Sequence, residues 1–199
     1  EEDEEDEEEE EEEDDDAELA WKLLDISREL YQKGIDACST SGGDVALKAR
    51  LTVQLARVTS RIGDLNMTNG NYGDALGEFE QVLRLREEQR DESVSAQCKL
   101  ADTNLQVAFA YLEHSRSNPG ADVLVESTDG TTTRIASASE CRPQLEAYHQ
   151  RAATILKDLI QRLRDQRRPI DNLSDDEKAD ISDLMHELQR FGQEADGIE

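Results

Sequence analysis

Apolar residues recur every three or four positions along most of this chain, which is the spacing of amphipathic α-helices. Leu55, Val58, Ile62 and Leu65, for example, share one face of a helix. The pattern predicts helices over about residues 17–31, 45–68, 72–89, 93–113, 143–166 and 174–191. Since strand patterns are confined to one short region, the sequence predicts an all-α fold.

Turn residues indicate where these helices begin and end. Asn69-Gly70-Asn71 separates two helices, and helices joined by so short a turn pack antiparallel. Ser174 and Glu177 form a capping box, which predicts the start of the last helix. The other boundary signals are Gly34 and residues 38–43 as a flexible connection, Pro143 as a first helical residue, and Gly192 as a helix stop.

Residues 115–142 interrupt the helical pattern. Val123–Val125 and Thr131–Ile135 favour strands, and they flank Asp129-Gly130, a dipeptide typical of hairpin turns. An insertion rich in Ser and Thr can equally be disordered. The sequence therefore leaves both a hairpin and a disordered loop open.

Five residues of the middle helix pair resemble the tetratricopeptide repeat, a 34-residue unit of two antiparallel helices. Small and aromatic residues have the spacing of that repeat at Gly63, Gly70, Tyr72, Ala75 and Phe79. The resemblance implies that the small residues let the two helices approach closely. The expected fold is an all-α tetratricopeptide-repeat helical solenoid, with antiparallel helix pairs and a C-terminal capping helix.

The first repeat is incomplete in this sequence. Ala20, Leu24 and Ser27 match the second helix of a repeat, but an acidic run stands directly before them. We expect this helix to expose an apolar face that is covered either by further sequence or by a second copy in a homodimer. The expected organisation is a disordered acidic tract at 1–16, a helical domain at 17–191 with its insertion at about 115–142, and a flexible tail at 192–199.

Charge is distributed unevenly along the chain. It carries 48 acidic and 22 basic side chains, for a net charge of −26, and every residue from 1 to 16 is acidic. A run without apolar residues cannot form a core and is expected to stay solvated. Nucleic acids and anionic membranes are bound through Lys and Arg clusters, so neither is expected as a direct partner. The expected partners are cationic.

The sequence contains no recognisable motif of an enzyme or a cofactor site. His114, His149 and His186 have no Cys or second His at zinc-ligand spacing. A Gly-rich phosphate loop and a nucleophile motif are absent. The three cysteines are widely spaced and odd in number, which favours reduced thiols. We expect a protein that is not an enzyme and that uses no cofactor and no metal.

Two segments resemble one family of proteins. Ala17-Glu-Leu-Ala-Trp-Lys-Leu-Leu-Asp-Ile-Ser-Arg28 follows the acidic run, and Leu100-Ala-Asp-Thr-Asn-Leu-Gln-Val-Ala-Phe-Ala-Tyr111 lies further on. With the interrupted repeat, they are similar to the nuclear autoantigenic sperm protein family of histone chaperones. The resemblance covers about residues 1–112 well and the remainder in layout. It implies a nuclear protein, compatible with a cytoplasmic pool, that binds core histones 3 and 4 and shields them for nucleosome assembly; linker histone is a further candidate.

Two candidate histone-binding sites follow from this resemblance. The acidic run would speed encounter with basic histones, but each exposed ion pair contributes only about 0 to 1 kcal/mol. A concave groove lined by the first helices of the repeats is therefore expected to supply selectivity. The acidic-tract residues are Glu1, Glu2, Asp3, Glu4, Glu5, Asp6, Glu7, Glu8, Glu9, Glu10, Glu11, Glu12, Glu13, Asp14, Asp15 and Asp16. The groove residues are Asp64, Met67, Asp102, Leu105, Phe109, Leu112 and Glu113, beside Arg57 and Ser60.

Other assignments remain open at this point. Phe109 and Leu112 are equally compatible with core positions, because the pattern does not fix the rotation of their helix to better than one residue. A tetratricopeptide adaptor or co-chaperone scaffold would bind another protein's peptide. An adaptor for acidic peptides needs basic residues in the groove, and Asp64, Asp102 and Glu113 argue against it. A general scaffold whose acidic run aids solubility is the third function.

Overall fold

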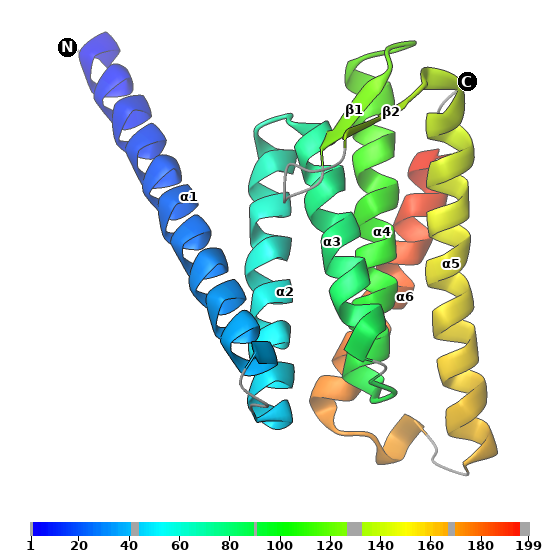
Figure 1. The fold of residues 1–199 in the computed structure, drawn as a ribbon. Coiled ribbons are helices and arrows are strands. Elements are labelled where there is room, and N and C mark those ends of the chain that lie inside the picture. The colour runs from blue at the N-terminus through cyan, green and yellow to red at the C-terminus, as the bar shows by residue number, and fades with distance from the viewer. Residues whose placement is uncertain (1, 41–43, 90, 127–132, 167–169, 196–199) are drawn as a thin grey trace.

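The computed structural model describes residues 2–40, 44–89, 91–126, 133–166 and 170–195 (Figure 1). The helices in these ranges are α1 (Glu2–Thr40), α2 (Val45–Thr68), α3 (Tyr72–Gln89), α4 (Val94–Ser117), α5 (Ala138–Asp165) and α6 (Asp175–Ala195). The remaining elements are the strands β1 (Val123–Glu126) and β2 (Thr133–Ala136) and the short 3₁₀ helix η1 (Ile170–Asn172). The prediction of an all-α fold is confirmed.

Consecutive helices from α1 to α5 pack against one another, as expected for a solenoid of helix pairs (Figure 1). The core runs through α3, α4 and α5 and reaches α6, and its largest buried side chains include Phe79, Tyr111 and Phe191. The predicted bounds of α2 and α3 are confirmed. Gly70 lies in the short turn between them with φ of 73°, a backbone conformation that favours glycine.

Gly63 and Phe79 form the close contact between α2 and α3 that the repeat spacing predicts. A Cβ atom added at Gly63 would lie 2.5 Å from Cε1 of Phe79. The Phe79 ring therefore occupies the space that any larger residue at Gly63 would need. Both residues are buried, so this contact sets the separation of the two helices.

α1 is much longer than the sequence predicts. The predicted start at about Ala17 is wrong, because the helix begins at Glu2. The flexible connection predicted at Gly34 and residues 38–43 is helical as far as Thr40, and residues 41–43 lie outside the described residues. Glu is a good helix former, and extending an existing helix avoids the cost of nucleation. Gly34 packs against α2 instead, where an added Cβ would lie 3.0 Å from Cδ1 of Leu51. The acidic run from Glu2 is thus part of α1 and differs from the disordered tract that its composition suggests; Glu1 lies outside the described residues.

Residues 123–126 and 133–136 form a pair of strands, as in the hairpin that was one of the two alternatives for this insertion. β1 pairs antiparallel with β2, with Val123 opposite Ala136. The predicted turn at Asp129-Gly130 lies outside the described residues. Val123 and Val125 are buried, and β1 packs on α3, where the backbone oxygen of Leu124 approaches Gly73.

The C-terminal helices differ from the prediction at two ends. α5 begins at Ala138, before Pro143, because Ser137 caps it and donates its N–H to Oε2 of Glu140 at 2.9 Å. The predicted start at Pro143 is wrong. Pro143 lies inside α5, which tolerates the loss of the backbone hydrogen bond that a proline cannot donate. The capping box at Ser174 is confirmed: Glu177 donates its N–H to Oγ of Ser174 at 3.2 Å. The predicted stop at Gly192 is wrong, since α6 continues to Ala195.

α1 carries the exposed apolar face that the incomplete repeat predicts. Leu19, Leu23, Ile26 and Leu30 are 53%, 57%, 56% and 63% exposed. They lie at helical spacing, away from the contacts with α2. The expectation of an uncovered face is confirmed.

Candidate functional site

α6 packs mainly against α4 and to a smaller extent against α5. The rings of Phe191 and of Phe109 on α4 pack in a T-shaped pair, with centroids 4.9 Å apart. The guanidinium of Arg190 lies over the same Phe109 ring, 5.0 Å from its centroid. Phe109, a predicted groove residue, is therefore largely covered by α6.

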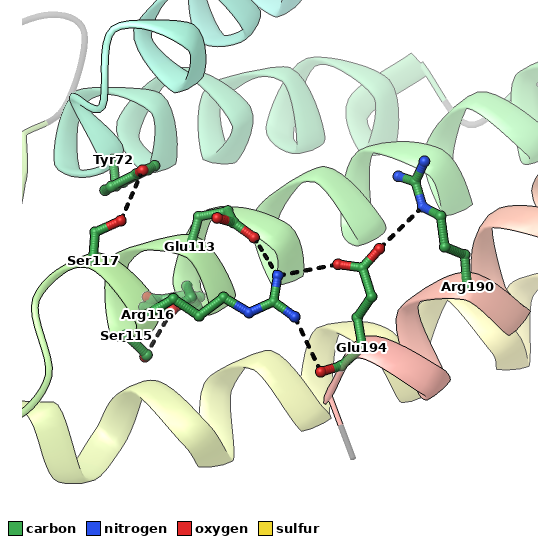
Figure 2. Close-up of polar contacts among 8 residues, drawn as sticks. Tyr72, Glu113, Ser115, Arg116, Ser117, Arg190 and Glu194 are labelled. Atoms are coloured by element: carbon green, nitrogen blue, oxygen red, sulfur yellow. Dashed lines mark hydrogen bonds and ion pairs between the residues drawn. The ribbon is translucent and has the colours of Figure 1, made fainter. Parts of the chain in front are cut away.

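Polar contacts join the C-terminal ends of α4 and α6, as Figure 2 shows. Nη1 of Arg116 lies 2.6 Å from Oε1 of Glu113 and 3.1 Å from Oε2 of Glu194. Nε of Arg190 is 3.5 Å from the other carboxylate oxygen of Glu194. These side chains are about one third exposed or more, so each pair adds little stability. Glu113, another predicted groove residue, is already engaged within the chain.

Three apolar residues predicted to line the groove pack in or against the core. Leu105 and Leu112 are 1% and 0% exposed and belong to the core, so their assignment as groove contacts is corrected. Met67 is partly buried and packs against the same core. A rotation of α4 by one residue moves a side chain by about 100°, which is enough to exchange core and groove positions.

Five carboxylates from three helices form what we call the acidic groove: Asp64 on α2, Asp102 on α4, and Asp180, Asp183 and Glu187 on α6. A cavity of about 140 Å³ lies between α4 and α6 and is lined by Asp102 together with the three α6 acids, Cys98, Lys99 and Leu184. On α2, Oδ1 of Asp64 accepts a hydrogen bond from Nε2 of Gln106 on α4 at 3.3 Å.

Burial and crowding raise the pKa of two carboxylates in the acidic groove. Burial is the largest cause for Asp102; Arg86 opposes it, and Asp64 and Glu187 add to it. Burial also raises the pKa of Asp64, opposed by Arg61, whose Nη1 lies 3.3 Å away. A cationic group from a ligand would relieve this unfavourable accumulation of negative charge.

The contribution of α6 to the acidic groove is absent from the sequence prediction. The sequence does contain a signal, because Asp180, Asp183 and Glu187 are spaced by three and four positions and so share one helix face. Their helix was expected to close the end of the stack. Its packing along α4 instead places that acidic face beside Asp102.

The acidic run occupies the N-terminal part of α1, which diverges from α2 and projects from the rest of the fold (Figure 1). The same helix packs against α2 further along. Residues 2–16 are therefore joined to the folded body by continuous helix.

Other classes of site find no support in the part of the chain that the structure describes. It contains no cluster of three or more His, Cys, Asp or Glu residues arranged to hold a metal ion. None of its helices combines the length and apolar character needed to cross a membrane. Burial raises the pKa of the Cys98 thiol to about 11, so this cysteine is a poor nucleophile at neutral pH.

Comparisons of this chain with family models, with curated proteins and with solved structures found no match.

Proposed function

We propose that this chain is a histone chaperone that binds histones 3 and 4 through its acidic run and its acidic groove. The acidic groove is the observation that carries the proposal. It combines acids from α2, α4 and α6 in one partly buried place, and two of them have pKa values raised by burial. Such a site favours Lys and Arg side chains, which abound on histones.

The acidic run adds charge that is not selective by itself. Its negative field would attract basic proteins from a distance and compete with DNA for the same cations. Salt weakens this attraction, whereas partly buried pairs in the acidic groove are screened less. Capture by the run and selection by the groove are therefore separable roles.

A binding panel tests this function directly. The intact chain and a chain lacking residues 1–16 are titrated with histone 3–histone 4 complex, with DNA and with an acidic peptide. We expect both chains to bind the histones, the shortened one more weakly, and neither to bind DNA. Absence of histone binding by both chains would contradict the proposal.

An adaptor for another protein's peptide is the alternative function. One observation favours it: Arg57, Arg86 and Lys99 line a cavity that shares Lys99 with the cavity between α4 and α6. In the same panel, an adaptor of this kind binds the acidic peptide more tightly than the histones. The carboxylates of the acidic groove outnumber these cations, so we favour the basic ligand.

A further inference from the structure

A second cavity of about 140 Å³ lies where the N-terminal part of α4 meets α2 and α3. Its wall contains three cationic residues, Arg57, Arg86 and Lys99, and Asp91 is the one acid among the described residues that line it. Oδ1 of Asp91 already accepts a hydrogen bond from the N–H of Ser93 at 2.8 Å. This cavity is therefore a positively charged place in a chain of net charge −26.

Arg86 is fixed in this wall by neutral groups. Its Nη1 donates hydrogen bonds to the backbone oxygen of Lys99 and to Oγ1 of Thr103. Burial lowers its pKa and the neighbouring Arg57 lowers it further, while Asp102 and Asp64 oppose these shifts. Within the described residues, neither arginine makes an ion pair across this cavity. A carboxylate bound in this cavity would offset the repulsion between the guanidinium groups of Arg57 and Arg86.

An unused hydrogen-bond donor lies at the same cavity. Gln89 is among the residues of the wall, and its buried Nε2 has no hydrogen-bond partner. Arginine binds carboxylates with two parallel hydrogen bonds, and the amide of Gln89 is a further donor in the same wall. The cavity thus offers charge and donors that suit one carboxylate group.

We infer that this cavity binds the carboxylate of an Asp or Glu side chain in the segment that occupies the acidic groove. Lys99 lines both this cavity and the one between α4 and α6. A ligand with an acidic residue close to a Lys or Arg can therefore place the carboxylate on one side of Lys99 and the cation on the other. Opposite charges at the two places fix the direction in which the segment lies. This inference rests on the proposed function for the identity of the ligand.

Arg57→Glu tests the inference through the sign of its effect. The substitution makes the chain more negative, so general attraction alone predicts tighter binding to basic histones. A carboxylate site predicts the opposite, about tenfold weaker binding of the histone 3–histone 4 complex. Arg84→Glu on α3 is the matched control, since Arg84 is exposed and does not line the cavity. Equal or tighter histone binding by Arg57→Glu, relative to the control, would overturn the inference.

A second measurement works without histones. Backbone amide and arginine side-chain NMR signals are followed while N-acetyl-glutamate amide or N-acetyl-glutamine amide is added. We expect the glutamate compound alone to shift the signals of Ala96, Gln97 and Arg86, and these shifts to vanish in Arg57→Glu. Equal shifts with both compounds, or none with either, would refute the carboxylate site. Selective shifts without any histone binding would sustain the site and contradict the proposed function instead.

Discussion

Gly63 shows how one missing side chain sets the distance between α2 and α3. Replacing it with Ala places a Cβ atom 2.5 Å from Cε1 of Phe79, inside a buried contact. Overpacking of this kind costs about 1–3 kcal/mol, more than the helix propensity that Ala gains. We expect Gly63→Ala to lower the urea midpoint of unfolding.

Gly192→Ala is the control for that substitution. Gly192 is also helical, but nothing lies within 4 Å of an added Cβ. This change should raise stability by about 0.5–1 kcal/mol through helix propensity alone. If both variants were stabilised, the Gly63–Phe79 contact would not control the helix separation.

Glu78 makes stability depend on pH. Burial raises its pKa to about 7, although Nη1 of Arg28 on α1 lies 2.9 Å from its carboxylate. Since the pKa is higher in the folded chain than the usual 4.5, the folded state holds more protons between these values. The contribution of Glu78 to the free energy of unfolding is complete below about pH 4.5 and is lost as the pH rises through 7.

Glu78→Gln tests this dependence. The free energy of unfolding is measured by urea denaturation between pH 4.5 and 8 for both chains. The variant should lose less stability across this range than the parent, because glutamine cannot ionise. Asp64 and Asp102 keep their own pH dependence in both chains and so cancel in the comparison. Parallel pH curves would show that Glu78 keeps an ordinary pKa.

At the level of elements, the hairpin is held against α3 through Gly73. An added Cβ at this position would collide with the backbone oxygen of Leu124, which cannot move without moving β1. We expect Gly73→Ala to detach the hairpin and to increase hydrogen exchange at Val123 and Val125. Gly70→Asn is the control, because Gly70 has open space around it and Asn tolerates its positive φ. Unchanged exchange in Gly73→Ala would mean that the hairpin is anchored elsewhere.

The elements that could be predicted are those whose signals are local. The bounds of α2 and α3 follow from their apolar spacing and from the turn at Asn69–Asn71, and Ser174 correctly predicts the start of α6. The start of α1 could not be inferred in this way, because the acidic run gives two opposite signals. It has no apolar residues to bury, which predicts disorder, but its many Glu residues favour a helix. The earlier start of α5 depends on Ser137, whose cap competes with the signal of Pro143.

The candidate site was less predictable because it depends on tertiary packing. Asp64 and Asp102 were predicted to lie beside each other, and their charges do interact in the structure. Leu105 and Leu112 were misplaced because the rotation of α4 is set by the helices that pack against it. The α6 acids and the cavity around Arg57 and Arg86 depend on the positions of several helices, which the sequence alone does not give.

On the scale of the whole molecule, the two negatively charged regions lie in different parts of the fold. The acidic run lies on a projecting helix, whereas the acidic groove is partly buried between helices. Removing the run takes away 16 acidic residues but leaves the folded body with a net charge of −10, from 32 acidic and 22 basic residues. We expect the chain without residues 1–16 to show a shallower dependence of histone affinity on salt, since exposed charges are the most strongly screened. Equal salt slopes for the two chains, measured by titration from low to moderate salt, would contradict this division.

The most direct test of the account is the affinity of Asp64→Asn/Asp102→Asn for the histone 3–histone 4 complex at moderate salt. Both substitutions remove charges that burial already disfavours, so the variant should remain folded. Asp158→Asn/Asp165→Asn, at two exposed positions of α5, removes the same number of charges and controls for a simple change in net charge. We predict that the double variant binds histones at least tenfold more weakly than this control. Equal affinity of the two would show that the acidic groove is not the histone-binding site.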